Sequence, residues 1–309
     1  HIVLAAPVGE LTHLRRVEHG ARGVRRGGDE QPGQRRLGVG AVHIGQRRRD
    51  DDAGGVVLGV FAAVAVAFVV VPLVALLLEV RWSHFAADLQ TAGTREALLL
   101  SLRTTTTTAA LSALFGTPLA WWLSRLRGRA AAWLRALVTV PLVLPPVVAG
   151  VALLDAWGRG GLIGPVLQDS FGTSLPYSWV RVVLAETFVA MPFFVVAAEG
   201  AFRGIDARWA RTATVLGASR WYTLRRVLIP MAAPGLLAGL TLSWARALGE
   251  FGATMTFAGS FPGTTQTGPL AVYQALDISQ DAATALAALM LGICLVVLAL
   301  LRGRWSGVR

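Results

Sequence analysis

The stretch DARWARTATVLGASRWYTLRRVLIP, residues 206–230, and the apolar stretch that continues it to Gln274 decide the fold of this chain. The first part is amphipathic, rich in arginine and interrupted by one glycine, Gly217. The second part contains an apolar run of membrane-spanning length, and this run carries ALGEFGAT at residues 247–254. A polar segment at a membrane surface is therefore continuous with an acidic, glycine-rich segment within the membrane.

The composition predicts a multi-spanning membrane protein. Of the 309 residues, 54% are hydrophobic, and the mean hydropathy is +0.56. The net charge of +11 comes from short basic segments between apolar blocks, so we expect a lipid bilayer and no nucleic acid as partner. The chain has no lysine, which a standard ATP-hydrolysing P-loop requires. We assign it no catalytic residue, cofactor or metal ligand, and the single cysteine, Cys294, excludes a disulfide within one chain.

Apolar stretches of about 20 residues, the length that a helix needs to cross a bilayer, recur along the chain and predict an all-α fold with about six transmembrane helices. They are residues 55–78, 97–123, 134–157, 179–201, 232–257 and 283–301. Arginines follow the second, fourth and sixth stretches, whereas the link 258–282 has none. By the positive-inside rule both termini face the cytoplasm.

The first 54 residues differ from the rest. They are rich in arginine and glycine and show no sustained hydrophobic period, which predicts a disordered N-terminal extension. Residues 55–309 are then the transmembrane domain, with a cytoplasmic loop at about 203–230. A signal peptide is the alternative for 55–78, but this apolar run is longer than the 7–15 residues typical of signal peptides.

Polar residues within the predicted spans are candidates for function by default. Among Asp155, Glu186 and Glu199, which lie near or inside spans, only Glu186 lies deep enough in its stretch to matter. The run Thr104–Thr108 favours a packing role, because threonine hydroxyls can bond back to their own helix. Pro141, Pro145 and Pro146 in the third stretch are typical both of bent transporter helices and of membrane helices in general.

Residues 204–230 predict helix, turn and helix. Gly217 follows a short helix, where a left-handed cap is favoured, and Ser219 can cap the next helix. Trp221, Leu224 and Val227 or Leu228 share one face of that second helix, and Pro230 is predicted to stop it. Such a helix suits a groove on a partner protein, and it equally suits the membrane surface.

The spacing of this segment resembles the coupling motif of ABC importer membrane subunits, whose pattern is Glu-Ala-Ala, three residues, Gly, nine residues, Ile-x-Leu-Pro. Gly217 and residues 227–230 match it without a gap, but Arg211-Thr212-Ala213 stands where Glu-Ala-Ala belongs. The resemblance implies that this loop docks into an ATP-hydrolysing subunit. The candidate coupling residues are Arg211, Thr212, Ala213, Gly217, Ala218, Ser219, Trp221 and Pro230.

The fifth predicted span carries an acid and a base four residues apart, Arg246 and Glu250, which places both on one helix face. The two form either a gate or a structural ion pair. Gly249 and Gly252 would allow a second helix to approach closely. The gate and translocation candidates are Arg246, Gly249, Glu250, Gly252, Thr254 and Thr256.

LGEFGAT at 248–254, with FAG at 257–259 and FPGTTQT at 261–267, resembles the membrane subunit of molybdate importers. LPPVVAG at 144–150 and GRGGLIG at 158–164 extend the resemblance, which covers about residues 95–301. Sulfate and thiosulfate importers share the Leu-Gly-Glu-Phe-Gly-Ala core, so they and tungstate remain alternatives. Glu250 would repel a dianion, which favours a gating role over a ligand role.

The resemblance implies the fold of a type I ABC importer permease in the cell membrane, working as a homodimer. Its partners would be two ATP-binding cassette subunits, which bind the ATP, and an extracytoplasmic molybdate-binding protein. A secondary transporter is a rival, but the chain shows no clear internal repeat. An intramembrane enzyme is disfavoured, because the spans contain no His-Glu-x-x-His or Gly-x-Ser-x-Gly motif and no histidine.

Overall fold

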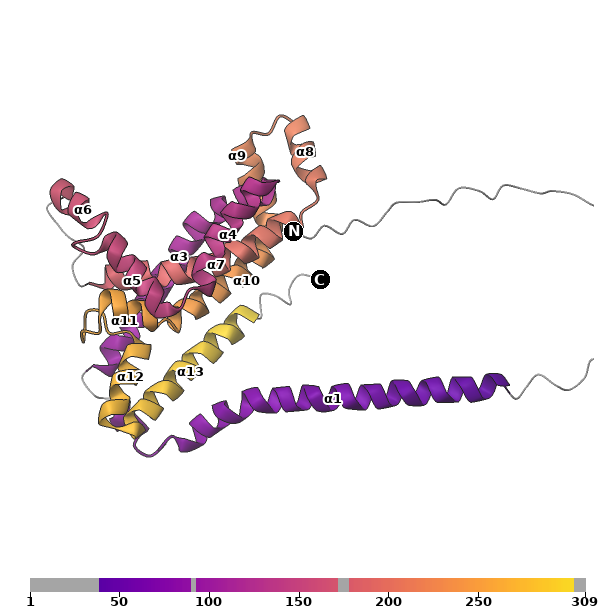
Figure 1. The fold of residues 1–309 in the computed structure, drawn as a ribbon, viewed down its shortest axis with the longest axis horizontal. Helices are drawn as coiled ribbons and strands as arrows, with labels where there is room; N and C mark the ends of the chain where they lie inside the picture. Colours follow the sequence, from indigo (N-terminus) through magenta and orange to yellow (C-terminus); the bar gives the residue numbers. More distant parts are fainter. Residues whose placement is uncertain (1–38, 90–92, 172–177, 303–309) are drawn as a thin grey trace, which may run out of the picture. The chain divides into compact units, whose positions relative to one another are not determined.

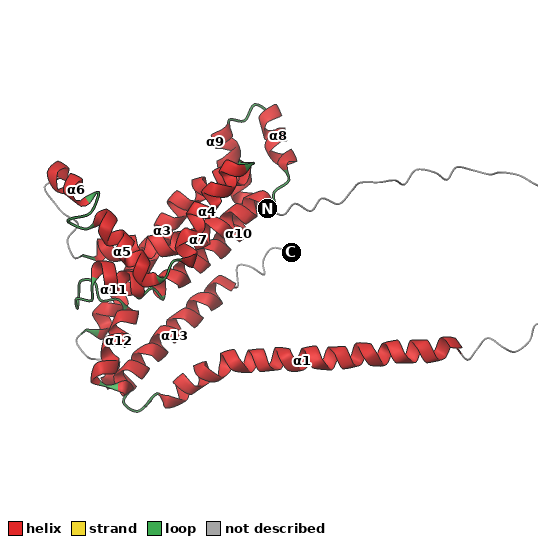
Figure 2. Ribbon diagram, viewed as in Figure 1, coloured by secondary structure: helices red, strands yellow, loops and turns green. Residues whose placement is uncertain are grey.

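The computed structural model describes residues 39–89, 93–171 and 178–302, and these residues form helices joined by turns, with no strand among them (Figure 2). The all-α prediction is confirmed. The described helices are α1 (Val39–Glu79), α2 (Phe85–Leu89), α3 (Thr94–Arg125), α4 (Arg129–Val143), α5 (Pro146–Trp157), α6 (Gly164–Phe171), α7 (Trp179–Arg203), α8 (Ala207–Val215), α9 (Arg220–Thr223), the π-helix η1 (Leu224–Leu228), α10 (Ile229–Leu248), α11 (Gly252–Ala258), α12 (Gly268–Ile278) and α13 (Gln280–Arg302) (Figure 1).

The first helix, α1, has 41 residues and contains the predicted first span. It begins at Val39, so the predicted boundary between residues 54 and 55 falls inside a helix and is not the start of one. Residues 57–79 are apolar and long enough to cross a bilayer. The predicted disorder of residues 1–38 lies outside the described residues.

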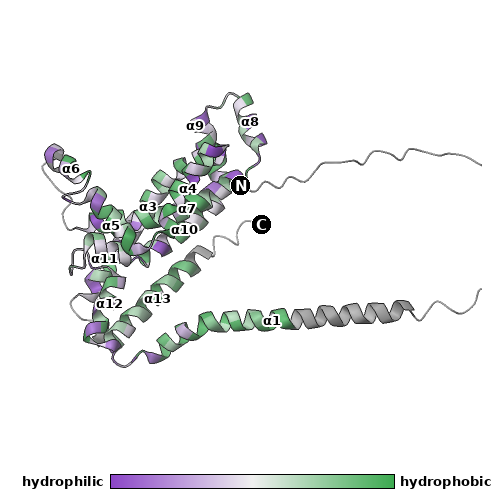
Figure 3. Cartoon of the chain, viewed as in Figure 1, coloured by the Kyte–Doolittle hydropathy of each residue, from purple (hydrophilic) through white to green (hydrophobic). Residues whose placement is uncertain are grey.

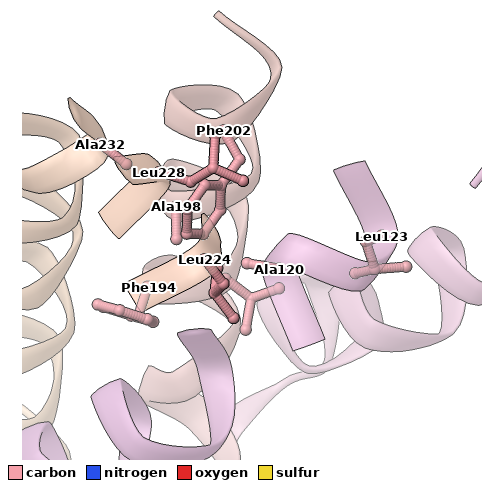
Figure 4. Packing of buried hydrophobic residues seen from close by; sticks show 9 residues of the cluster. Ala120, Leu123, Phe194, Ala198, Phe202, Leu224, Leu228 and Ala232 are labelled. Carbon is pink, nitrogen blue, oxygen red and sulfur yellow. The ribbon is translucent and has the colours of Figure 1, made fainter. Parts of the chain in front are cut away.

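Helices α3, α7 and α10 form the centre of the second part of the chain, and α4 packs against α7 (Figure 1). Small residues allow the close approach: a Cβ at Gly116 would lie 2.6 Å from the Phe194 ring, and one at Gly235 would lie 2.4 Å from the Ala201 Cβ. Figure 4 shows one buried cluster at this centre. It comprises Ala120, Leu123, Phe194, Val195, Ala198, Phe202, Leu224, Leu228 and Ala232.

Hydropathy and length identify fewer spans than the six predicted. Four described helices qualify, 57–79, 179–203, 220–248 and 280–299, and a bent pair of helices would make a fifth (Figure 3). The predicted second span lies in α3, which has 32 residues but is not among the helices apolar enough to qualify. Its threonine run lowers its hydropathy, and most of its threonine and serine side chains are buried in the bundle: Thr94, Ser101, Thr104, Thr105, Thr108 and Ser112.

The predicted third span is wrong as a single helix. α4 ends at Val143 and α5 begins at Pro146, with an angle of 114° between them. Leu144 is extended, with φ −62° and ψ 131°. Proline disfavours a helical conformation in the residue before it and cannot donate a backbone hydrogen bond, so Pro145 and Pro146 end one helix and begin another.

The predicted fifth span, 232–257, is also two helices. α10 ends at Leu248 and α11 begins at Gly252, so Arg246 lies on a helix while Glu250 lies in the break after it. At its other end α10 is continuous with α9 through η1. Pro230 therefore does not stop the preceding helix as predicted. Ile229 donates to the Leu224 carbonyl in η1, and this wider π turn just before the proline adjusts the hydrogen bonding that a proline disrupts in a helix.

Candidate functional site

The segment 207–223 projects from one end of the bundle as two short helices, α8 and α9, joined by a tight turn (Figure 1). Gly217 has φ +82°, the left-handed conformation predicted for it, and Ala218 donates to the Ala213 carbonyl across the turn. Ser219 caps α9 as predicted, with its side chain accepting from the Tyr222 N–H at 3.2 Å. The predicted helix–Gly–helix geometry is confirmed.

An aspartate that sequence reasoning did not single out, Asp206, caps α8. Its carboxylate accepts from the Arg208 backbone N–H at 2.8 Å and from the Arg208 guanidinium at 2.7 Å. These two hydrogen bonds hold the pKa of Asp206 below its usual value. The sequence contains a pattern that predicts this cap, because an aspartate just before a helical run is a common N-terminal cap.

The two helices bury one face and leave an apolar tip exposed. Ala213, Leu224 and Leu228 are buried, whereas Val215 and Leu216 are 86% and 81% exposed. Trp221 was predicted to share a face with Leu224, but it is 67% exposed. Leu224, three residues later, is buried, so the two side chains have different surroundings.

The remaining coupling candidates lie on the outside of this segment. Arg211, Thr212 and Ser219 are exposed, Ala218 is half-buried beside Gly217, and Pro230 is exposed at the start of α10. The exposed surface at the α8–α9 turn thus combines arginines with large apolar side chains, which is the composition of a surface that binds another protein.

At the break between α10 and α11, Glu250 makes two strong contacts. One carboxylate oxygen lies 2.6 Å from Nη2 of Arg246, and the other accepts from the Ala253 N–H at 2.8 Å. Glu250 is 2% exposed. The pair therefore joins the last turn of α10 to the first turn of α11, although Glu250 belongs to neither helix.

α11 packs closely on α5, the helix that follows the other break. A Cβ at Gly252 would lie 2.5 Å from the Pro146 Cβ, and one at Gly150 would lie 2.5 Å from the Thr256 Cβ. The predicted close approach is confirmed for Gly252. A Cβ at Gly249 would meet only the Ala245 carbonyl of its own helix, at 3.8 Å.

The two threonine candidates of α11 differ. The Thr256 hydroxyl donates to the Gly252 carbonyl at 2.9 Å and so bonds back to its own helix. Thr254 is fully buried, and its hydroxyl has no hydrogen-bond partner among the described residues. The structure thus brings Arg246, Glu250 and Gly252 together at the break, while the two threonines lie further along α11.

Glu186 on α7 is bound by the threonine run of α3. Its carboxylate accepts from Thr104 at 2.8 Å and from Thr108 at 3.0 Å, and all three residues are almost fully buried. Thr105 and Thr107 bond back to α3, as predicted for the whole run, and the Thr104 hydroxyl also lies 3.2 Å from the Ser101 carbonyl of its own helix. Thr104 and Thr108 are four residues apart, and this spacing, which places both on one helix face, could have predicted that they share a partner.

A second missed contact ties α4 to α3 and α7 near the coupling segment. The Arg135 guanidinium donates to Glu199 at 2.6 Å and to the Leu123 and Leu126 carbonyls at 2.6 and 3.1 Å. It thereby satisfies carbonyls at the C-terminal end of α3. Within the described residues no group of three His, Cys, Asp or Glu side chains could hold a metal ion.

Comparison with known proteins identifies the family. Residues 112–305 match the family described as binding-protein-dependent transport system inner membrane component. The chain is 45% identical over 236 residues, 76% of its length, to the molybdenum transport system permease protein ModB of Mycobacterium bovis, of which 89% is covered. It is 38% identical over 210 residues to the ModB protein of Escherichia coli K12, covering 68% of this chain and 92% of that protein.

Solved structures support the fold. The bacterial ABC transporter involved in the import of alginate superposes with a TM-score of 0.66 at 16% identity, covering 85% of this chain and 99% of that one. The MetNI methionine ABC transporter in an inward-facing conformation gives a TM-score of 0.54 at 19% identity, covering 68% and 94%. The chain is therefore a multi-pass membrane protein that belongs to the family of binding-protein-dependent transport system inner membrane components and has the fold of ABC importer permeases.

Proposed function

We propose that the chain is the permease subunit of an ATP-driven molybdate importer, and that it forms the translocation pathway by alternating access. The observation that carries the proposal is the 45% identity to a molybdenum transport permease over 76% of this chain. A Haloferax volcanii relative at 42% identity, a probable molybdenum ABC transporter permease, supports the same cargo.

The coupling function is assigned to the α8–α9 segment. An exposed apolar tip on two capped helices fits a groove in an ATPase subunit better than it fits water. Because α9, η1 and α10 are continuous, displacement of the tip would be transmitted along one rod to the break at Gly249. ATP binding and hydrolysis belong to that partner, since this chain lacks the P-loop lysine.

The gating function is assigned to the break itself. Arg246 and Glu250 hold the end of α10 against the start of α11, and α11 is packed on α5 through Gly252 and Gly150. A movement of α10 would pull on this ion pair before it reached α5. The pair thus holds α10 and α11 in their relative positions in the closed state. This role does not require a transported dianion to contact Glu250.

The assembly would contain two copies of this chain, two ATPase subunits and an extracytoplasmic molybdate-binding protein, with both termini of each chain in the cytoplasm. The arginine distribution supports this orientation. The alginate transporter relative was solved with a substrate-bound periplasmic protein, which supports a binding protein as a partner kind.

Uptake of labelled molybdate by the complete complex, reconstituted in vesicles with its binding protein and ATPase, tests the proposal. We expect ATP-dependent uptake that excess tungstate reduces and excess sulfate does not. Uptake of labelled sulfate that molybdate fails to reduce would assign the chain to the sulfate class. ATP-independent uptake driven by an ion gradient would assign it to the secondary transporters.

A further inference from the structure

A cavity of about 560 Å³ lies between the end of α3 and the start of α8. Its walls come from the α3–α4 turn, the end of α7 and the first turns of α8, so it connects the bundle to the coupling segment. The volume is in the range of small-molecule sites. Neither the proposed translocation pathway nor the exposed α8–α9 tip uses this cavity.

The walls are strongly basic. Arg125, Arg127, Arg203 and Arg211 line the cavity, and Asp206 is the acidic residue among them. The Asp206 carboxylate is already bound by Arg208, which points to a positive charge that the cavity walls themselves do not balance.

Three of the four arginines make no close ion pair, although Arg211 has a longer-range electrostatic interaction with Asp206. Arg203 lies 3.8 Å from Glu199, but none of the described carboxylates lies within 4 Å of Arg125, Arg127 or Arg211. The Arg125 guanidinium is stacked 4.7 Å above the Trp121 ring, which orients it without neutralising it. Unpaired guanidinium groups around one concave site form a binding site for an anion with several oxygens.

Arg211 contributes to the positive charge of the cavity and is also the residue that stands where the coupling motif of ABC importers has its glutamate. A glutamate there would add a negative charge to the cavity wall, whereas arginine makes it more basic. The substitution therefore favours an anion at this position.

We propose that this cavity binds a tetrahedral oxyanion group, either the phosphate of an anionic lipid headgroup or a free oxyanion such as phosphate or molybdate. The bound group would bridge Arg125 at the end of α3 and Arg127 on the α3–α4 turn to Arg211 on α8. It would thereby fix the coupling segment relative to the bundle and modulate how strongly ATP hydrolysis drives transport.

The test uses the complete complex in nanodiscs and compares Arg127→Gln with Arg129→Gln. Both arginines are exposed, Arg127 on the α3–α4 turn and Arg129 at the first position of α4, but only Arg127 lines the cavity. One arm measures binding of labelled phosphate and labelled molybdate in phosphatidylcholine nanodiscs by equilibrium dialysis. The other arm counts phosphatidylglycerol molecules that remain bound to the complex by native mass spectrometry.

We expect Arg127→Gln to weaken binding about tenfold in at least one arm, as loss of one charge-assisted hydrogen bond predicts, and Arg129→Gln to change it less than twofold. An effect confined to the first arm identifies a free oxyanion, and one confined to the second identifies a lipid headgroup. Arg127→Lys, which keeps the charge, should restore part of the binding.

Equal effects of Arg127→Gln and Arg129→Gln would overturn the proposal, as would the absence of saturable binding in both arms. Either result would mean that these arginines only set membrane orientation. Since binding is measured directly, this result is independent of whether the cargo is molybdate.

Discussion

Arg246 and Glu250 are joined by an ion pair of 2.6 Å that spans the end of α10 and the break before α11. Glu250 also accepts the Ala253 N–H, so a single buried carboxylate holds the two helices together. The pair was predicted on one continuous helix. At a break the ion pair has a different effect from one within a helix, because it resists relative movement of the two helices that it joins.

Glu250→Gln tests this relationship. The amide oxygen can still accept the Ala253 N–H, but the charge attraction to Arg246 is lost, so the closed state is weakened. We expect a higher basal ATPase rate, or a measurable molybdate leak, in the reconstituted complex. Asp277→Asn, at an exposed acid on α12, is the matched control and should leave both unchanged. Unchanged basal activity in Glu250→Gln would make the pair structural.

Gly252→Ala tests the contact between α11 and α5. The added Cβ would lie 2.5 Å from the Pro146 Cβ, so one of the two helices must move. Overpacking of this kind costs about 1–3 kcal/mol. We expect a lower melting temperature of the purified protein in detergent and reduced uptake. Gly249→Ala, whose Cβ would meet only a carbonyl of its own helix at 3.8 Å, should melt within a degree or two of the wild type.

Thr104→Val tests the polar contact between α3 and α7. The valine keeps the shape but removes a hydroxyl that donates to Glu186 at 2.8 Å, and the buried carboxylate loses a partner. The expected destabilisation is about 1–3 kcal/mol, seen as a lower melting temperature. The exposed Thr106, changed to valine, provides the control. Equal melting temperatures for the two variants would mean that Glu186 does not depend on Thr104.

Gly217→Ala tests the turn of the coupling segment. There is space for a Cβ, since nothing lies within 4 Å, but φ of +82° is unfavourable for any residue with a side chain, by about 1–2 kcal/mol. We expect weaker association with the ATPase subunit and slower uptake, while the chain still inserts in the membrane. Gly200→Ala, at a helical glycine with equal space, should bind the ATPase normally.

Asp206→Asn tests the cap of α8 through its pH dependence. Because the folded-state pKa of Asp206 lies below the ordinary value of 3.8, its extra stabilisation is present above that value and is lost as the pH falls through the folded-state pKa. Asparagine can still cap the helix but does not titrate. The stability advantage of the wild type in thermal unfolding should therefore be constant above about pH 5 and shrink as the pH approaches 3. A constant difference down to pH 3 would contradict the assignment.

Much of the coupling segment could be predicted because caps and turns depend on a few neighbouring residues. Gly217 and Ser219 adopt the predicted roles, since a left-handed turn and a helix start are decided within four residues of the chain. The prediction for Pro230 was wrong, and the cause is again local in the sequence. The π turn of η1, just before Pro230, accommodates a proline that was expected to end the helix. A π turn has no clear sequence signal.

The amino-acid sequence is enough to predict that the chain is a helical membrane protein, where most of its apolar helices lie and what its coupling turn looks like. These properties follow from hydropathy and local backbone preference. Three other features become visible only in the folded chain: Glu186 meets threonines 82 and 78 residues away, α5 and α11 pack closely after two breaks, and arginines from three segments line one cavity. Such contacts depend on how helices distant in sequence pack, and no local pattern records that.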